Sequence, residues 1–481
     1  MAEFGIIAHG AYVPRLRLDR KIIAEAHRWM APGLGEGAKG ARAFRSWDED
    51  CVTMAVEAAR DGLRGADARK IASVTVASTT FPYADLQHSA IVADALRLPS
   101  SVRSLDMASS QRAGVSALLQ ALRMGEESLV IASDAPVGKP GSARELSFGA
   151  GAAAFALGRG EPLARLVSCH SRTVGFVDHF RPAGEPFDYF WEDRWVRDEG
   201  YLALVPPVVE AALREAQMTI GDVKTLVMPS MLRGAAPAVA RQMGFKGALA
   251  SDLDKDCGYS GAAHALLMFS AALDEASPGE RILLVGFGQG VDALVFEVGK
   301  KPAPIAGRRG VAGALKDALP TDSYLRMLSF YGNIELEWGM RAEKVNKTAL
   351  TEQYRSSHQT AGFVAGRCRA CGAIQFPQLQ YCVTPTCRAG SDQFDQLSLV
   401  DAPAKLLTHT ADWLSYHPAP PLHVGFVQFD NGARLMMEVV DVGPGGVEPG
   451  APLRMVMRVK ERDAARGYVR YFWKSTPLDI G

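Results

Sequence analysis

The chain has 481 residues, of which 48% are hydrophobic and 22% charged, so it is long enough to build two or more cores and is not a disordered chain. Lys and Arg total 53 and Asp and Glu total 53, which excludes broad electrostatic attraction to nucleic acid or to an anionic membrane. Seven cysteines are too few for a disulfide scaffold at this length. The sequence shows neither a signal-peptide pattern nor an apolar run of about 18 residues, which predicts a soluble, cytoplasmic protein.

Residues 1–300 alternate short β-branched runs with long Ala-rich helical patterns, which predicts a layered α/β region. Its two halves, 1–165 and 166–300, follow one plan: a strand, a turn into an Ala/Leu-rich helix, a strand ending in small residues, and a closing strand. The pattern predicts an internal duplication with a helix buried between two sheets.

Residues 301–360 change to a Pro/Gly/basic linker followed by a helical, amphipathic connector from about 323 to 355. Residues 361–391 hold four clustered cysteines, and 392–481 show short strand patterns at 424–429, 434–440 and 468–473. Short strands over such a length are typical of a small β-barrel.

The four clustered cysteines are Cys368, Cys371, Cys382 and Cys387. Two close pairs separated by a hairpin can surround one tetrahedral ion with thiolates, which predicts structural zinc; four unliganded thiols on a loop are the alternative. Four sulfur ligands leave no open coordination position, so such an ion stabilises the fold and activates no water.

Residues 104–118 are predicted to form a strand that enters a helix through a turn of small residues, the place where acyl-transfer enzymes hold a nucleophile. Gln111 occupies that place. A carboxamide cannot attack a thioester at neutral pH, whereas a thiolate can, so this turn forms no covalent acyl-enzyme.

Three segments, 4–18, 47–59 and 286–290, resemble the hydroxymethylglutaryl-CoA synthase branch of the thiolase superfamily, close to ketoacyl-synthase III. Residues 366–377 resemble the zinc-ribbon plus OB-fold module that accompanies thiolase-like acyl-CoA enzymes. The resemblance implies a duplicated five-layer thiolase-like α/β fold followed by a four-cysteine zinc ribbon and an OB-fold β-barrel. It also implies a CoA thioester as substrate and a homodimer.

Four positions depart from that family pattern. Gln111 replaces the nucleophilic Cys, Ser230 follows the strand that normally leads to a His, Tyr259 replaces an Asn, and Thr79 falls where the synthase has an acidic base. The resemblance therefore does not imply synthase or ketoacyl-synthase activity.

Two functions fit such a site. In the first, backbone N–H groups near Gln111 and in the 286–290 turn stabilise an enolate, so that a 3-hydroxyacyl-CoA undergoes aldol or retro-aldol chemistry. In lacking the nucleophile, the chain resembles the steroid side-chain aldolases. The second is a catalytically silent scaffold that holds a thiolase-like partner. A synthase-like acyltransferase or decarboxylase is a further alternative, since decarboxylating ketoacyl-synthase-like domains also carry Gln at this place.

Tyr259 is the preferred acid/base, with a core-filling Tyr as the alternative. Gln111 could donate to the thioester oxygen or only fill space, Ser230 could bind substrate or only fill space, and a lone His264 is more often structural. His179 could act as the base if its loop enters the pocket.

Contacts to the substrate are predicted at positively charged and aromatic positions. Arg233 and Lys255 could bind the CoA phosphates, and Gly288 lies in the Gly-rich turn. Phe180 and Arg181 belong to a segment that resembles the synthase's Asp-Phe-Trp-Arg element, whose aromatic surroundings suit a hydrophobic acyl group or a packed loop. Aromatic and basic residues at 466–474 superficially resemble a nucleic-acid surface, but the balanced charge argues for packing or acyl-CoA contact and against nucleic-acid or membrane partners.

Overall fold

The computed structural model describes residues 3–301 and 304–478 and divides into two compact units. The second unit contains Ser46–Glu49, Asp94–Arg97 and the chain from Leu325 onward, and the first contains the rest of the described chain. Pro302 and Ala303, inside the predicted linker, lie outside the described residues. Among the described helices, none combines the length and apolar character needed to cross a bilayer.

The first unit is organised around ten hydrogen-bonded strands in the order β12-β11-β13-β14-β8-β1-β7-β6-β4-β5. In chain order these strands are β1 (Glu3–Tyr12), β4 (Ser73–Ala77), β5 (Arg103–Met107), β6 (Ser128–Asp134), β7 (Gly151–Gly160), β8 (Ala164–Thr173), β11 (Thr225–Val227), β12 (Ala248–Leu249), β13 (Arg281–Phe287) and β14 (Gly290–Val298). The predicted duplication is visible in the pairing: β4 runs parallel to β5 and β6, and β11 runs parallel to β12 and β13. An antiparallel hairpin, β6–β7 or β13–β14, then closes each half.

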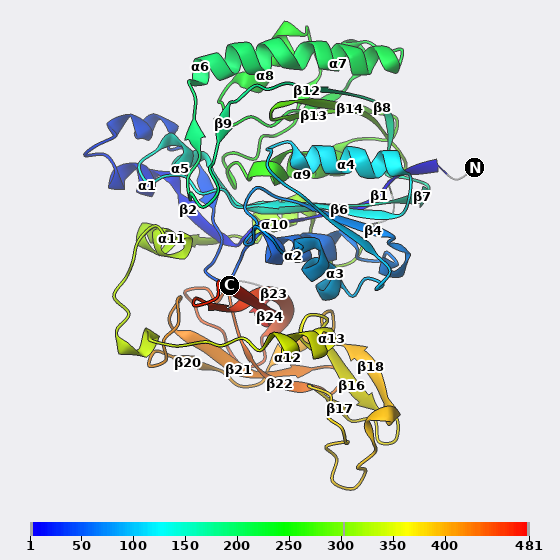
Figure 1. The fold of residues 1–481 in the computed structure, drawn as a ribbon, viewed down its shortest axis with the longest axis vertical. Helices are drawn as coiled ribbons and strands as arrows, with labels where there is room; N and C mark the ends of the chain where they lie inside the picture. The colour runs from blue at the N-terminus through cyan, green and yellow to red at the C-terminus, as the bar shows by residue number, and fades with distance from the viewer. Residues whose placement is uncertain (1–2, 302–303, 479–481) are drawn as a thin grey trace. The chain divides into compact units, whose positions relative to one another are not determined.

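Helices separate and cover these strands as five layers (Figure 1). The central layer holds α4 (Ala113–Met124) and α9 (His264–Glu275), each of which contacts strands of both halves, while α2 and α7 cover the outer faces. The remaining α-helices of the first unit, with one π-helix, are α1 (Arg20–Ala26), α2 (Cys51–Gly62), α5 (Ala143–Ser147), α6 (Asp193–Trp195), the π-helix η3 (Val196–Leu202), α7 (Ala203–Glu215), α8 (Ala235–Gln242) and α10 (Gly310–Lys316). α3 (His88–Leu96) starts in the first unit and ends in the Asp94–Arg97 segment of the second. The predicted α/β thiolase-like fold is confirmed.

Small residues explain why the two central helices come so close. A Cβ atom at Gly114 would lie 2.5 Å from the carbonyl oxygen of Ala262, so only glycine permits this approach at the start of α4. Along β6 and most of β7 every residue is buried, as expected for strands covered by helices on both faces. A short sheet of β2 (Leu16–Asp19), β3 (Ala41–Ala43) and β15 (Leu319–Thr321) flanks this core.

The second unit begins with short helices and continues as strands. Its helices are α11 (Tyr324–Tyr331), α12 (Leu350–Arg355) and α13 (Ser357–Thr360). The connector predicted from about 323 to 355 is helical at both ends, in α11 and α12. Between them Gly332 and Gly339 adopt left-handed φ angles of 74° and 70°, which interrupt helical structure there.

Two sheets follow these helices. The first pairs β16 (Val364–Cys368) with β17 (Ile374–Gln375) and β18 (Phe394–Ser398). The second contains β19 (Ala404–Leu406), β20 (Thr410–Asp412), β21 (Leu422–Phe429), β22 (Arg434–Glu438), β23 (Pro452–Asp463) and β24 (Tyr468–Pro477). A bridge between Val439 and Ser475 links the end of β22 back to β24 and closes the predicted barrel.

The aromatic and basic residues of β24 are used in the fold of the second unit. Trp473 is buried, stacks on Phe363 and donates its indole N–H to the Ala361 carbonyl at 2.6 Å. Lys474 is 3% exposed and its ammonium lies 3.0 Å from Asp48 and 2.9 Å from Glu438. A lysine paired in this way is not available to a phosphate backbone.

Candidate active site

Two cavities of the first unit contain most of the predicted site residues. The first cavity, about 470 Å³, lies at the start of α4 between the ends of β4 and β5, the hairpin of β9 (His179–Phe180) and β10 (Tyr189–Phe190), and the 288–289 turn. The second cavity, about 520 Å³, is lined by the 228–237 segment, parts of α5 and the residues before α9.

The predicted residues divide between these cavities. Those lining the first cavity are Gln111, His179, Phe180, Arg181 and Gly288. Those lining the second are Tyr259, Ser230 and Arg233, whereas Lys255 is exposed, lines neither cavity and accepts the Ala41 N–H through its carbonyl at 2.8 Å. The structure therefore places the two acid/base candidates, Tyr259 and His179, on different cavities.

Gln111 is buried at the turn between β5 and α4. The turn is formed by small residues and reverses at Ser109, which has a left-handed φ of 67°. The Gln111 side-chain nitrogen lies 3.3 Å from Nε2 of His179. Among the described residues the Gln111 backbone N–H has no acceptor, so it is a donor available to a ligand in the first cavity.

Gly288 brings the opposite turn against Gln111. Its carbonyl accepts the Ser110 hydroxyl at 3.1 Å, while its own N–H donates to the Gly290 carbonyl at 3.0 Å. The Gly288 N–H, which the sequence predicts as a donor to the substrate, is therefore already used within the turn. Of the Gly288 and Gln111 backbone N–H groups, only that of Gln111 is left for a ligand.

Replacing Gly288 with alanine is expected to destabilise the first unit by about 1–3 kcal/mol, because the added Cβ would lie 2.7 Å from the Ser110 hydroxyl oxygen and 3.3 Å from the Gln111 nitrogen. Urea unfolding followed by circular dichroism measures this change. Gly175→Ala is the matched control, since nothing lies within 4 Å of its Cβ position, and equal destabilisation of both variants would contradict the close approach.

His179 is oriented by the short hairpin of β9 (His179–Phe180) and β10 (Tyr189–Phe190), in which it pairs with Phe190 and stacks on that ring at 5.4 Å. Its Nδ1 lies 3.1 Å from the carboxylate of Asp178, which is 4% exposed. Burial by itself lowers the pKa of His179, but the Asp178 carboxylate outweighs it and the pKa lies above its usual value. Nδ1 makes no hydrogen bond among the described residues, so Asp178 acts on the ring through its charge, and Nε2 faces the Gln111 amide.

Phe190 contacts residues of both cavities. His179 stacks on its ring from the first cavity, and the Arg144 guanidinium, which lines the second, lies 4.5 Å from the ring centroid. Phe148 continues the aromatic series, 6.0 Å from Phe190 and 6.4 Å from Tyr259. Phe190 and Phe148 therefore form a series of ring contacts that links His179 of the first cavity to Tyr259 of the second.

Tyr259 is 7% exposed, and its backbone N–H donates to the Ser147 carbonyl at 2.7 Å. Burial, with further contributions from Tyr201 and Asp178, raises the pKa of the Tyr259 phenol well above its usual value, so the group stays protonated. The Ser230 hydroxyl donates to the Leu232 carbonyl at 3.0 Å and is used within its own turn.

His264 has a structural role, as expected. Burial lowers the pKa of His264 to about 4, and its two ring nitrogens lie 3.2 Å from the Ser260 hydroxyl and 2.8 Å from the Asp252 carbonyl. At the position of the synthase's acidic base, the Thr79 hydroxyl donates to the buried Asp134 carboxylate at 2.7 Å.

The cysteines of the first unit do not replace the missing nucleophile. No cysteine of the described chain lines either cavity. Burial raises the pKa of the Cys257 thiol to about 12, and burial also raises the pKa of Cys51 well above its usual value. Both thiols are therefore protonated and enclosed.

Sequence reasoning missed three features of the first cavity: the Asp178 partner of His179, the pair of His88 and Asp106 at 2.8 Å, and Asp188 beside Arg181 at 3.2 Å. The Asp178-His179 dipeptide is the only local signal for any of them. His88 and Asp106 meet only when separate segments come together at the cavity, whereas Arg181 and Asp188 lie on the two sides of the β9–β10 hairpin.

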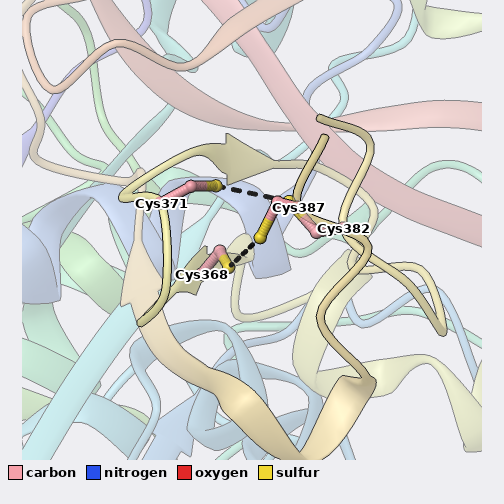
Figure 2. Close-up of side chains that lie close together, drawn as sticks. All are labelled: Cys368, Cys371, Cys382 and Cys387. Atoms are coloured by element: carbon pink, nitrogen blue, oxygen red, sulfur yellow. Dashed lines mark hydrogen bonds between the residues drawn. The ribbon is translucent and has the colours of Figure 1, made fainter. Parts of the chain in front are cut away.

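The four clustered cysteines converge in the second unit (Figure 2). Their sulfur atoms all lie within 4.8 Å of one another, with Cys368 3.7 Å from Cys387 and Cys371 3.5 Å from Cys382. Metal–sulfur bonds of about 2.3 Å in a tetrahedron place sulfurs roughly 3.8 Å apart, so the arrangement fits one tetrahedral ion.

Comparisons with known proteins agree with both units. Residues 213–297 match the family model of the 3-oxoacyl-(acyl-carrier-protein) synthase III C-terminal domain, and residues 404–458 match that of the ChsH2 C-terminal OB-fold domain. The chain is 32% identical to a hydroxymethylglutaryl-CoA synthase of Methanocella arvoryzae over 309 residues, 62% of this chain and 88% of the relative. It is 30% identical to the synthase of Methanopyrus kandleri over 307 residues, 61% of this chain and 87% of the relative.

Solved structures show the same fold. A hydroxymethylglutaryl-CoA synthase complexed with CoA superposes with a TM-score of 0.57 at 18% identity, covering 73% of this chain and 95% of that one. The synthase III FabH of Pseudomonas aeruginosa superposes with a TM-score of 0.55 at 21% identity, covering 63% of this chain and all of that one.

Fold and site together define a thiolase-superfamily acyl-CoA enzyme with an OB-fold domain. At the turn between β5 and α4, where the resemblance predicts a thiol, this chain carries the amide of Gln111. The chain belongs to the hydroxymethylglutaryl-CoA synthase family.

Proposed function

We propose that the chain cleaves, or in the reverse direction forms, the C2–C3 bond of a 3-hydroxyacyl-CoA without a covalent acyl-enzyme. The products of cleavage are an aldehyde or ketone and a shorter acyl-CoA. The observation that supports this proposal is the Gln111–His179–Asp178 cluster, which joins a hydrogen-bond donor to a positioned base in a cavity that no described cysteine lines.

In the cleavage direction, neutral His179 takes the proton of the 3-hydroxyl group through Nε2, and the C2–C3 bond breaks as the C3 carbonyl forms. The bonding electrons move to the thioester as an enolate. The Gln111 N–H donates to the enolate oxygen, an interaction worth about 3 kcal/mol in comparable sites. His179 returns the proton to C2, and the Asp178 carboxylate, 3.1 Å from Nδ1, stabilises the intervening imidazolium.

The second cavity is proposed to receive coenzyme A. Arg20 and Arg144 line it but are paired with Asp254 and Asp193, whereas Arg233 has no ion-pair partner among the described residues and is exposed at the rim. An unpaired guanidinium is suited to a phosphate. Tyr259 and Ser230 then act as walls of this cavity, and Tyr259, being protonated, cannot serve as the base.

The rate constant kcat/KM is expected to rise with pH through the raised pKa of His179, because only the neutral imidazole accepts the hydroxyl proton. Asp178→Asn removes the carboxylate that raises this pKa, so the rising limb should move to lower pH and the plateau should fall. Asp193→Asn, at the ion pair of the second cavity, is the control that leaves the limb in place. If the rising limb of the pH profile stays at the same pH in Asp178→Asn, His179 is not the group whose titration controls kcat/KM.

Incubation of the purified chain with 3-hydroxyacyl-CoAs, with hydrazine trapping of the carbonyl product and mass spectrometry of the shorter acyl-CoA, tests the reaction. An acyl adduct on the intact chain, or hydroxymethylglutaryl-CoA formed from acetyl-CoA and acetoacetyl-CoA, would overturn it. The loss of the synthase residues at all four positions supports a second candidate, a silent scaffold. No turnover together with tight binding of a thiolase-like partner would establish the scaffold.

We also propose that the four-cysteine site holds zinc, because closed all-thiolate sites are typical of structural zinc. Reduced cysteines that act as ligands suit the cytoplasm. A homodimer is proposed through β5, the last strand of the ten, where Leu105 is 50% exposed.

A further inference from the structure

We propose that the first cavity selects a bulky, non-anionic, ring-bearing substituent at C3 of the substrate. The carbonyl product is then an aromatic or alicyclic aldehyde or ketone and not a short-chain one. This inference rests on the proposed function, because it assigns the cavity beside Gln111 and His179 to the leaving half of the molecule.

The size of the cavity is the first observation. Its volume is about 470 Å³, within the range of roughly 300–1,000 Å³ that buries drug-sized ligands. A methyl group is close in size to one water molecule, whose share of liquid volume is about 30 Å³. A C3-methyl substrate would therefore leave most of the cavity filled with water, and a ring system would displace that water.

The lining of the cavity is the second observation. Phe81, Tyr83, Phe180 and Leu86 contribute aromatic and aliphatic surface to its wall. Phe180 is 49% exposed and Leu86 is 42% exposed, so two large apolar side chains of this wall remain open to a ligand. A ring-bearing substituent that buries these two side chains should bind more tightly than a short chain, because it removes more apolar surface from water.

The aromatic wall is held in place before any ligand binds. Buried His88 stacks on Phe81 with ring centroids 4.1 Å apart, accepts the Tyr83 N–H at 3.3 Å and lies 2.8 Å from the Asp106 carboxylate. Rings fixed in this way lose little freedom when a flat ligand packs on them.

Carboxylates outnumber guanidinium groups at the cavity. Asp106, Asp178 and Asp188 line it together with Arg181, which pairs with Asp188 at 3.2 Å. An anionic substituent would lose its hydration and meet the remaining carboxylates, so the wall disfavours an anion.

The test uses binding and turnover as separate arms. In the binding arm, calorimetry compares 3-phenylpropionyl-CoA with butyryl-CoA, neither of which carries the hydroxyl group needed for cleavage. The phenyl compound is expected to bind about tenfold more tightly or better. In the turnover arm, kcat/KM for 3-hydroxy-3-phenylpropionyl-CoA is expected to exceed that for 3-hydroxybutyryl-CoA by a similar factor.

Leu86→Trp partly fills the cavity and should lower both phenyl values about tenfold while leaving the short-chain values within about threefold. Leu249→Trp is the matched control, because Leu249 is 40% exposed on β12 and lines neither cavity. This control variant should behave as the wild type.

Four outcomes decide the matter. Equal binding of the two analogues, including no binding of either, overturns the inference. Equal turnover of the two substrates overturns it while the proposed function stands. Preferential phenyl binding that Leu86→Trp removes, without turnover of any substrate, supports the inference and defeats the proposed reaction. Phenyl preference that survives Leu86→Trp overturns the assignment to this cavity.

Discussion

His179→Gln is expected to lower kcat for cleavage of a 3-hydroxyacyl-CoA by roughly 100- to 10,000-fold, the range typical for loss of a positioned general base. In the wild type the Gln111 side-chain nitrogen lies 3.3 Å from Nε2 of His179. The glutamine introduced at position 179 keeps a polar side chain of similar length beside Gln111, but an amide cannot take the hydroxyl proton. Steady-state assay of carbonyl release measures the loss, and KM should change far less than kcat, because the proton transfer occurs in the transition state.

Tyr259→Phe is the matched control for this experiment. It removes one hydroxyl group from the other cavity, where burial keeps the phenol protonated, and should cost less than about tenfold in kcat. Thermal unfolding of both variants shows whether the fold is retained. A larger loss in Tyr259→Phe than in His179→Gln would return the acid/base role to the tyrosine that sequence reasoning prefers.

Removal of the metal from the four-cysteine site is expected to unfold the β16–β18 ribbon. Binding of structural zinc contributes about 10–16 kcal/mol in small zinc-dependent domains, more than a short three-stranded sheet supplies from its own packing. Cys382→Ala, at a buried ligand position, should lower the metal content from one equivalent to near zero and make the ribbon sensitive to protease. Elemental analysis and limited proteolysis measure the two effects.

Cys169→Ala is the control for the metal experiment, since Cys169 lies on β8 and outside the four-cysteine cluster. This variant should keep its metal and its resistance to protease. Full metal content in Cys382→Ala would show that three sulfurs suffice. Unchanged proteolysis after complete chelation would show that the ribbon folds without an ion.

The amide of Gln111 stands where the resemblance predicts a thiol at the start of α4, and this exchange excludes a covalent acyl-enzyme at that position. A thiolate holds the acyl group covalently, whereas Gln111 can only donate hydrogen bonds. The Gln111 N–H is still available to an oxygen atom, and His179 with Asp178 supplies proton transfer beside it. The proposed enolate chemistry needs no thiolate, whereas acyl transfer through a covalent acyl-enzyme does.

Several parts of the architecture are predictable because they depend on local pattern. The repeated strand and helix plan identifies the duplicated α/β region, and the strand patterns near 424–429 and 468–473 fall on β21 and β24. Cysteine spacing identifies the cluster that the fold brings together. The helical connector from 323 to 355 is found in part, as α11 and α12, because the left-handed glycines Gly332 and Gly339 interrupt it.

The candidate site is predictable only as a set of residue types. Gln111 and His179 are 68 positions apart, and only the β9–β10 hairpin brings their nitrogens to 3.3 Å. Tyr259 matches a family position as clearly as Gln111 does, yet the fold directs it to the other cavity. By sequence the Gly288 N–H is a candidate donor, but its bond to the Gly290 carbonyl occupies it.

The sequence alone determined that no thiolate is available at the α4 turn, because the identity of residue 111 fixes its chemistry whatever the fold around it. It also determined the duplicated layers and the four sulfur ligands, which follow from periodicity and spacing. Only the tertiary structure decided which polar groups share a cavity and which of them can accept a proton. A pKa depends on burial and on neighbouring charges, and both come from segments far apart in the chain.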